Sequence, residues 1–262
     1  MSSLQFRIKM LQQYKDLIRE LVVRDVKLKY RRSFLGYIWS VLNPLLIMIV
    51  MTVVFSAMFK RNIKNYPVYL LIGRMTYDFL QNSTNAAMRS VTGNAALMKK
   101  TYIPKYIFTV AKVTSSLVDF VFSLGALMIV MIATRAQFHP TILLLPLLFV
   151  QVYLFCLGLG FLLAELHVFF RDIQYIYRAI LVAWLYLTPI FYPIEQLPPA
   201  LAMGIKLLNP LYYYVSQFRD LVLYGRFPGP RIFWGGWLMG ILMMVIGVWA
   251  FQKHKDKFIL YI

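Results

Sequence analysis

The chain has 262 residues, of which 60% are hydrophobic, and it carries 28 Lys and Arg against 10 Asp and Glu. A water-soluble domain this apolar would expose much nonpolar surface, so the composition excludes most soluble classes. The net charge of +18 would suit a nucleic-acid surface, but basic residues scattered between long apolar runs are typical of loops that face anionic lipids. The sequence therefore predicts an all-α integral membrane protein with no nucleic-acid partner.

Residues 1–33 are expected to form an amphipathic helix on the cytoplasmic side. Apolar residues recur every three or four positions from Leu11 to Leu28, and charged residues occupy the opposite side. This pattern is typical of a helix that lies in the membrane interface. A helix packed on a soluble neighbour has the same pattern, so both interpretations stay open.

Six longer segments are expected to cross the membrane, because a bilayer-spanning helix needs about 20 mostly apolar residues. They cover residues 34–59, 68–91, 107–133, 142–164, 176–192 and 233–251. The second is unusual, since Asp78, Gln81 and Asn85 lie where lipid disfavours polar groups. We expect this face to contact protein or a watery path.

Four charged residues inside or beside these spans have no partner that the sequence identifies. Lys112 and Asp119 are seven residues apart in the third span and therefore share a helix face. Arg74 and Asp78 lie in the second span. The partners of all four stay open at this stage.

An external gate segment of residues 193–231 is expected between the last two spans. It holds two moderately apolar stretches, Leu197–Leu208 and Leu211–Tyr224, which Asn209 and Pro210 separate. Each is too short to cross a bilayer. Two short helices that re-enter or lie on the membrane would account for them, and so would an ordinary folded loop.

Orientation follows from the distribution of basic residues. Of the 28 Lys and Arg, 18 fall on the side that holds both termini and 8 on the other side. Cytoplasmic loops are enriched in Lys and Arg, so both termini, including the tail of residues 252–262, are predicted to be cytoplasmic.

No catalytic or nucleotide-binding motif is present in the sequence. No stretch matches the GxxxxGK[ST] phosphate loop, no HExxH spacing occurs, and the one cysteine, Cys156, lies in an apolar run. The chain is therefore expected to have no cofactor and no catalytic residue of its own.

Several strings, in order and covering most of the chain, resemble the membrane subunit of ABC exporters for polysaccharides, the type 2 exporter class that serves O-antigen, teichoic acid and capsule. They are RDVKLKYRRSFLGYIWSVLNPLL from Arg24, YPVYLLIG from Tyr66, KKTYIPK from Lys99, FFRDIQY from Phe169, LTPIFYPIEQLP from Leu187 and LNPLYYYVSQFRDLVLYG from Leu208. One stretch departs from the family pattern: residues 74–78 read RMTYD, where the family commonly has an apolar stretch and a tryptophan.

The resemblance implies a permease that works as a homodimer, with each copy docked on a separate ATPase subunit that binds Mg-ATP. The implied substrate is a polyprenyl-pyrophosphate-linked polysaccharide, moved out across a bacterial plasma (inner) membrane. Lys29, Arg31 and Arg32 would attract its pyrophosphate at the cytoplasmic surface, although they also fit simple positive-inside anchors.

Two short cytoplasmic loops would couple the permease to the ATPase. In the first, Asn94 is suited to cap a short helix from Ala95 to Lys100. The coupling candidates are Lys99, Lys100, Tyr102, Pro104, Arg171 and Asp172. Loops that serve only to orient the chain would look similar.

Aromatic residues near the span ends would line the path or gate it, because sugar rings slide along aromatic faces. The candidates are Tyr37, Trp39, Tyr77, Phe79, Trp184, Phe191, Tyr192, Tyr212, Tyr213 and Tyr214. The ordinary aromatic belt at a membrane interface is the competing interpretation.

Two other functions remain as alternatives. A type 2 permease for a small drug or lipid would share the same architecture. A membrane enzyme that processes polyprenyl phosphate would instead depend on Asp78 and Asp119 as essential carboxylates.

Overall fold

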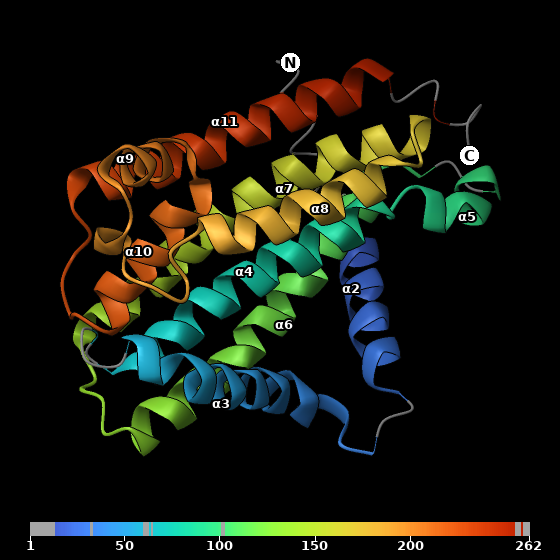
Figure 1. The fold of residues 1–262 in the computed structure, drawn as a ribbon. Coiled ribbons are helices and arrows are strands. Elements are labelled where there is room, and N and C mark those ends of the chain that lie inside the picture. The colour runs from blue at the N-terminus through green and yellow to red at the C-terminus, as the bar shows by residue number, and fades with distance from the viewer. Residues whose placement is uncertain are drawn as a thin grey trace.

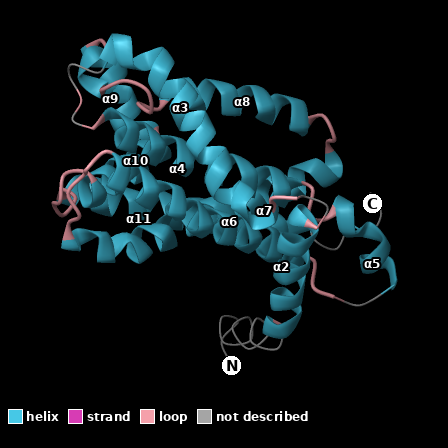
Figure 2. Ribbon diagram, turned by 90° about the horizontal axis from the view of Figure 1, so that it is seen from below, coloured by secondary structure: helices cyan, strands magenta, loops and turns pink. Residues whose placement is uncertain are grey.

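A computed structural model describes residues 14–31, 34–59, 63, 65–100, 103–254 and 258. Every regular element in these ranges is helical (Figure 2). The longer helices are α2 (Lys15–Tyr30), α3 (Trp39–Phe59), α4 (Tyr66–Met88), α5 (Ala95–Lys100), α6 (Tyr106–Ala133), α7 (Leu145–Phe169), α8 (Ile173–Leu187), α9 (Pro199–Leu208), α10 (Pro210–Val222) and α11 (Pro230–His254). Short 3-10 turns lie at Gly36–Ile38, Thr92–Asn94, Pro140–Leu144 and Ile194–Gln196.

Among the residues that the structure describes, four helical segments are long and apolar enough to cross a membrane: Gly36–Phe55, Tyr106–Ala133, Pro140–Phe169 and Pro230–His254. The two other expected spans correspond to α4, which is rich in polar residues, and to α8. With 15 residues at about 1.5 Å each, α8 is about 22 Å long, shorter than a hydrocarbon core of about 30 Å. Length and composition alone therefore identify four spans.

The polar helix α4 lies at the centre of the molecule. It packs against α3, α6, α7 and α10, and most of its residues are buried. In Figure 1 the axes of α4, α6, α7, α8 and α11 are inclined in roughly the same way, so these helices form one bundle. Neighbouring helices thus cover most of α4, so its sequence need not be apolar all round.

The closest contact between two helices is that of α7 and α11. A Cβ atom added at Gly158 of α7 would collide with the backbone of Met243, and one at Gly247 of α11 would collide with Gly158. The two backbones touch there because glycine has no side chain to hold them apart, as is common between membrane helices.

The two ends of the helix bundle differ in content. Helices α9 and α10 lie at one end, whereas α2, α5, the turn between α7 and α8, and the C-terminal end of α11 lie toward the other (Figures 1 and 2). The expected gate segment and the expected cytoplasmic elements are therefore separated along the length of the bundle.

The segment between α8 and α11 contains the two expected short helices, with the break at Asn209. The Asn209 Oδ1 atom accepts hydrogen bonds from the Leu211 backbone N–H at 3.0 Å and from the Trp184 indole N–H at 2.8 Å. Its Nδ2 atom donates to the Thr188 hydroxyl at 2.9 Å. One side chain therefore caps α10 and holds it against the end of α8.

Helix α10 is inserted into the molecule rather than lying on its surface. Most of its residues are buried, and it contacts α4, α7 and α11. Two buried amides, Gln217 of α10 and Gln151 of α7, form a hydrogen bond of 2.9 Å.

Candidate functional site

One face of α4 carries a continuous row of polar side chains. Arg74, Asp78, Gln81, Asn85 and Arg89 follow one another at three- and four-residue steps, so they share a face. They are partly or fully exposed, whereas most of the remaining helix is buried. We call these five residues the polar row.

The row begins with an ion pair inside α4. Arg74 and Asp78 lie 2.9 Å apart, and each side chain is about four-fifths buried, with 18% and 25% exposed. The Arg74 guanidinium also lies 5.5 Å from the centre of the Tyr77 ring. Arg74 and Asp78 are therefore partners of each other. Residues 74–78, which depart from the family pattern, thus form one charged unit held by hydrogen bonds.

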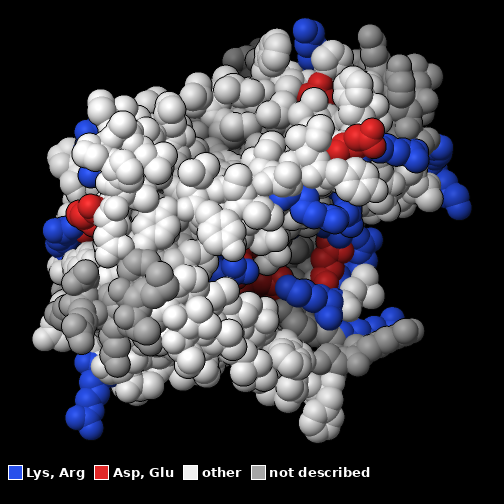
Figure 3. All heavy atoms as spheres, in the orientation of Figure 1, with Lys and Arg blue, Asp and Glu red and all other residues white. Residues whose placement is uncertain are grey.

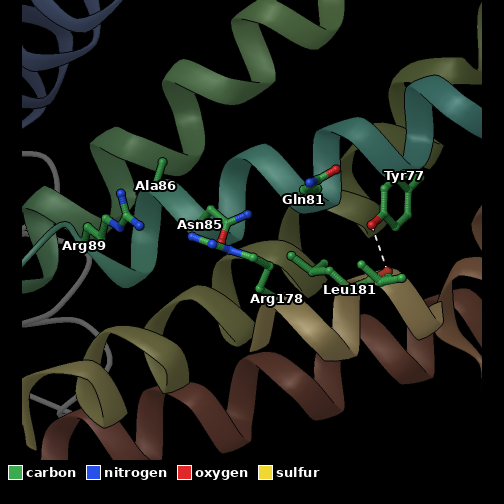
Figure 4. Close-up of a pocket in the computed structure, with 8 residues that line it drawn as sticks. Tyr77, Gln81, Asn85, Ala86, Arg89, Arg178 and Leu181 are labelled. Atoms are coloured by element: carbon green, nitrogen blue, oxygen red, sulfur yellow. Dashed lines mark hydrogen bonds between the residues drawn. The ribbon is translucent and has the colours of Figure 1, made fainter. Parts of the chain in front are cut away.

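A pocket of about 420 Å³ opens between α4 and α8 along the other end of the row (Figure 4). It is lined by Tyr77, Gln81, Asn85, Ala86, Arg89, Arg178, Leu181 and Val182. This volume falls within the range of small-molecule sites, about 300–1,000 Å³.

Two tyrosine hydroxyls join the walls of the pocket. Tyr77 of α4 donates to the Leu181 carbonyl of α8 at 2.8 Å, and Tyr177 of α8 donates to the Thr84 hydroxyl of α4 at 2.7 Å. Otherwise α8 contacts α4 over a short stretch only. The polar lining is thus accessible because α8 covers α4 incompletely.

Two arginines line the pocket from opposite walls. Figure 4 shows Arg178 of α8 reaching toward Asn85, with Arg89 nearby at the end of α4. Arg89 donates to the Gln174 side-chain carbonyl at 3.4 Å. Within the described ranges, no carboxylate forms an ion pair with either arginine.

Ion pairs join α2 to α6 and identify the partners of Lys112 and Asp119. Lys112 lies 2.8 Å from Asp25, and Asp119 lies 2.7 Å from Lys29. Each helix contributes one acid and one base, so the two pairs are reciprocal. In Figure 3 the charged side chains gather around a hollow on the right-hand half of the face, and most of the remaining face is uncharged.

The proposed head-group residues fall at the end of α2. Lys29 is ion-paired with Asp119, so its charge is already partly neutralised. Arg31 follows the helix and is exposed. Arg32 lies outside the described residues.

The candidate coupling residues lie on two turns at the same end of the bundle. Lys99 and Lys100 are exposed on α5, which has the bounds expected from sequence, and Pro104 follows it. The expected cap of α5 by Asn94 is not formed, because Asn94 belongs to the preceding 3-10 turn and its side-chain amide donates back to the Ser90 carbonyl at 2.7 Å. Tyr102 lies outside the described residues.

The second turn, between α7 and α8, exposes Arg171 and Asp172. A surface groove of about 460 Å³ there is lined by Leu166, Phe169, Phe170, Arg171, Asp172, Ile173 and Ile176. A groove with apolar walls and a charged rim is suited to receive a protein segment.

The aromatic candidates do not converge on one belt. Five of them, Tyr77, Phe79, Phe191, Tyr213 and Tyr214, are buried within the chain. Tyr37 and Trp39, before and at the start of α3, are exposed, and Trp184, Tyr192 and Tyr212 are half-buried. Phe79 stacks on Phe120 at 5.1 Å, and the Tyr214 hydroxyl donates to the Gly236 carbonyl at 3.1 Å. These two side chains pack the core and leave little surface for a sugar.

Sequence reasoning missed Arg219 of α10, which is buried with 5% exposure. Its guanidinium donates to the carbonyls of Pro189 at 2.7 Å, Ile190 at 3.1 Å and Tyr69 at 3.2 Å, and it lies 3.3 Å from the centre of the Tyr69 ring. It therefore joins α10, α4 and the chain after α8. In the sequence it is only one more cation in the external segment. Its partners are backbone carbonyls, which every residue has, so they cannot be recognised from residue types.

The described part of the chain contains no group of three His, Cys, Asp or Glu side chains that could hold a metal ion.

Comparison with known proteins gives consistent matches across nearly the whole length. The chain is 28% identical over 254 residues to the O-antigen export system permease protein RfbA of Myxococcus xanthus, covering 96% of this chain and 97% of that protein. It is 27% identical to RfbA of Klebsiella pneumoniae, with 93% of each chain covered. It is 21% identical to the polysialic acid transport protein KpsM of Escherichia coli, over 80% of this chain and 83% of that protein.

The family described as ABC-2 type transporter matches residues 16–223, which is most of the chain. The apolar helices and the incompletely covered polar face agree with that match. The chain is a multi-pass membrane protein and belongs to the ABC-2 type transporter family.

Proposed function

We propose that this chain is the permease subunit of an ATP-driven exporter that carries a polyprenyl-pyrophosphate-linked polysaccharide from the cytoplasm to the outer face of the bacterial plasma membrane. The names of the relatives support the substrate class, since they denote O-antigen and capsule polysaccharide export. The observation that carries the proposal is the polar row of α4.

The polar row has the dimensions and chemistry of one wall of a path for sugars. With 23 residues, α4 is about 34 Å long and matches a bilayer core of about 30 Å. Amides and a paired carboxylate and guanidinium hydrogen-bond hydroxyl groups both as donors and as acceptors. Polar residues within a bilayer are costly unless they face a watery cavity, and the uncovered row would line such a cavity.

A single chain supplies only one wall, because α8 leaves the row partly open. We propose that a second copy closes the path and that the exporter is a homodimer. The apolar outer surfaces of α3 and α8, including Val54, Ile176 and Ile180, are exposed in the single chain and are available for lipid or the second copy.

The proposed topology has six spans, with α4 and α8 as the second and fifth. Helix α4 would tolerate its polar row because that row faces the path while neighbouring helices cover the other faces, and the turn at residues 188–192 would complete the span that α8 begins. Both termini would be cytoplasmic, with residues 1–33 as the interface helix and 252–262 as the tail. Helices α9 and α10 would form the external gate, consistent with their position at the opposite end from α2 and α5 (Figure 1).

Two copies of an ATPase subunit would dock on α5 and on the turn between α7 and α8. Mg-ATP would bind in that subunit and not in this chain. The exposed Lys99, Lys100, Arg171 and Asp172 would contact it, and the groove beside Phe170 would receive one of its segments. Stiff docking points of this kind transmit nucleotide-driven closure to the helices.

The test is deletion and complementation, followed by reconstitution. Deleting the gene should abolish the surface glycan, and the wild-type chain should restore it. Reconstituted with its ATPase, the chain should show ATP hydrolysis that lipid-linked glycan stimulates. An intact surface glycan after deletion, together with turnover stimulated only by a drug or a simple lipid, would instead assign the small-molecule alternative.

A further inference from the structure

The pocket between α4 and α8 holds two positive charges that the described chain does not neutralise. Arg89 and Arg178 approach it from different helices, and the only described side-chain partner of Arg89 is the neutral amide of Gln174. Both arginine side chains are exposed, whereas two partly buried cations elsewhere, Lys112 and Arg74, are ion-paired with Asp25 and Asp78. Two exposed arginines that line one pocket without a carboxylate partner are suited to bind an external anion.

The chemistry of the lining changes along the pocket. The two guanidinium groups lie toward the C-terminal end of α4, followed by the amides of Asn85 and Gln81 and then by Tyr77 (Figure 4). From Arg89 to Tyr77 the helix advances 12 residues, or about 18 Å. From the C-terminal end of α4, the pocket therefore presents first the charged guanidinium groups, which bind anions, and then the neutral side chains, which form hydrogen bonds.

We infer that this pocket binds the diphosphate and the adjoining sugar of a lipid-linked saccharide at the start of the path, with Arg89 and Arg178 on the diphosphate and Asn85 and Gln81 on the sugar. A guanidinium presents a planar fork that matches two phosphate oxygens. A side-chain amide offers both a donor and an acceptor to sugar hydroxyls. The order of groups along the pocket is the order of groups in the ligand.

The inference rests on the proposed function and moves the main head-group contact away from the end of α2. Lys29 is engaged with Asp119, whereas Arg89 and Arg178 have no ion pair in the described chain. The head group would thus be held beside the polar row, where the sugar chain must pass, rather than on the outer surface of the interface helix.

An ordinary anionic phospholipid shares the phosphate chemistry, so the experiment separates the two sources. Permease purified with its ATPase would be titrated with farnesyl diphosphate, farnesyl monophosphate and inorganic pyrophosphate. The titrations would be repeated in nanodiscs that contain or lack phosphatidylglycerol. We expect farnesyl diphosphate to bind at least tenfold more tightly than the monophosphate, and phosphatidylglycerol to compete weakly.

The variants are Arg89→Gln and Arg178→Gln, each expected to weaken farnesyl diphosphate binding about tenfold or more, because a hydrogen bond to a charged group is lost. Arg178→Lys should retain part of the affinity. The control is Arg135→Gln, which removes the same charge from an exposed position at the end of α6, away from the pocket. Thermal unfolding of each variant separates lost binding from lost folding.

Unchanged binding in folded Arg89→Gln and Arg178→Gln would overturn the inference, as would equal affinity for phosphatidylglycerol. The proposed function fails by a separate result, since it requires the wild-type chain to restore surface glycan to the deletion strain. Restored glycan with unchanged ligand binding in both variants would reject the pocket and leave the export function standing.

Discussion

Two helix boundaries in this molecule show opposite ways of placing one helix beside another. At the boundary of α7 and α11, glycines bring the backbones into contact over a long stretch. At the boundary of α4 and α8, contact is short and depends on two tyrosine hydroxyls, with a pocket between the helices. Two helices whose backbones are in contact are suited to form a fixed scaffold. Two helices joined by only a few hydrogen bonds can separate at a small cost in free energy.

The difference indicates where the protein changes shape. We expect α7 and α11 to move together as one body, and α8 to move against α4 during transport. Interfaces packed at crystal-like density switch between discrete arrangements rather than deform, so opening should occur where packing is already incomplete. Four substitutions test this difference and the contacts that hold the neighbouring helices in place.

The largest effect is expected from Gly158→Leu. Its side chain would be built into the backbone of Met243, and the two helices would have to separate. We expect a loss of more than about 3 kcal/mol and little folded protein. Gly204→Leu is the matched control, because a Cβ atom added at Gly204 on α9 would meet no other element within 4 Å. Normal accumulation of Gly158→Leu would show that the tight boundary is not fixed.

Arg219→Gln should produce the next largest effect. Three carbonyls from α4 and from the chain after α8 would lose a charged donor, at a cost of about 2–3 kcal/mol. The midpoint of thermal unfolding should fall, and a cysteine placed in α9 should react faster with a water-soluble reagent. Arg231→Gln, exposed at the start of α11, should change neither measurement.

Reversal of one ion pair tests whether α2 moves with α6. Asp119→Lys places a positive charge beside Lys29 and should cost about 1 kcal/mol, since both side chains are partly solvated. The double variant Lys29→Asp with Asp119→Lys should recover stability and export. If the double variant is as impaired as the single one, the pair does not join the two helices.

Tyr177→Phe should have the smallest effect on stability and a clearer effect on transport. It removes one hydrogen bond between α8 and α4, worth about 1 kcal/mol, while the Thr84 hydroxyl keeps its bond to the Leu80 carbonyl. If α8 separates from α4 during transport, glycan-stimulated ATP turnover should change more than the unfolding midpoint does. Tyr175→Phe, exposed on the same helix, is the control.

Local signals in the sequence were sufficient for the short elements. The helix at Ala95–Lys100 and the break at Asn209 lie where expected. At Asn209 the reason is local, because a proline and a capping asparagine act on the backbone within a few residues. The burial of α10 was not predictable in the same way. It depends on Gln151 and Gly236 of other helices, which sequence order does not place beside α10.

The candidate site was predicted in part. The polarity of Asp78, Gln81 and Asn85 identified the unusual helix, because lipid penalises such residues wherever they occur. Arg178 could not be assigned to that site, since it lies on a helix 89 residues further along the chain than Arg89 and is one cation among many. Likewise, the spacing of Lys112 and Asp119 placed them on one face, but only the fold brings Asp25 and Lys29 opposite them.

The contacts of Asn209 have a mechanical consequence for α8. Its N-terminal end leaves the turn that exposes Arg171 and Asp172, and its C-terminal end is held to α10 through Trp184, Thr188 and Asn209. Because α8 is 15 residues or about 22 Å long, a tilt of about 10° about one end displaces the other by about 4 Å. A small rotation at the turn between α7 and α8 would thus displace the end of α8 that contacts α10 by about three-quarters of the 5.4 Å helical pitch, so α8 would act as a lever.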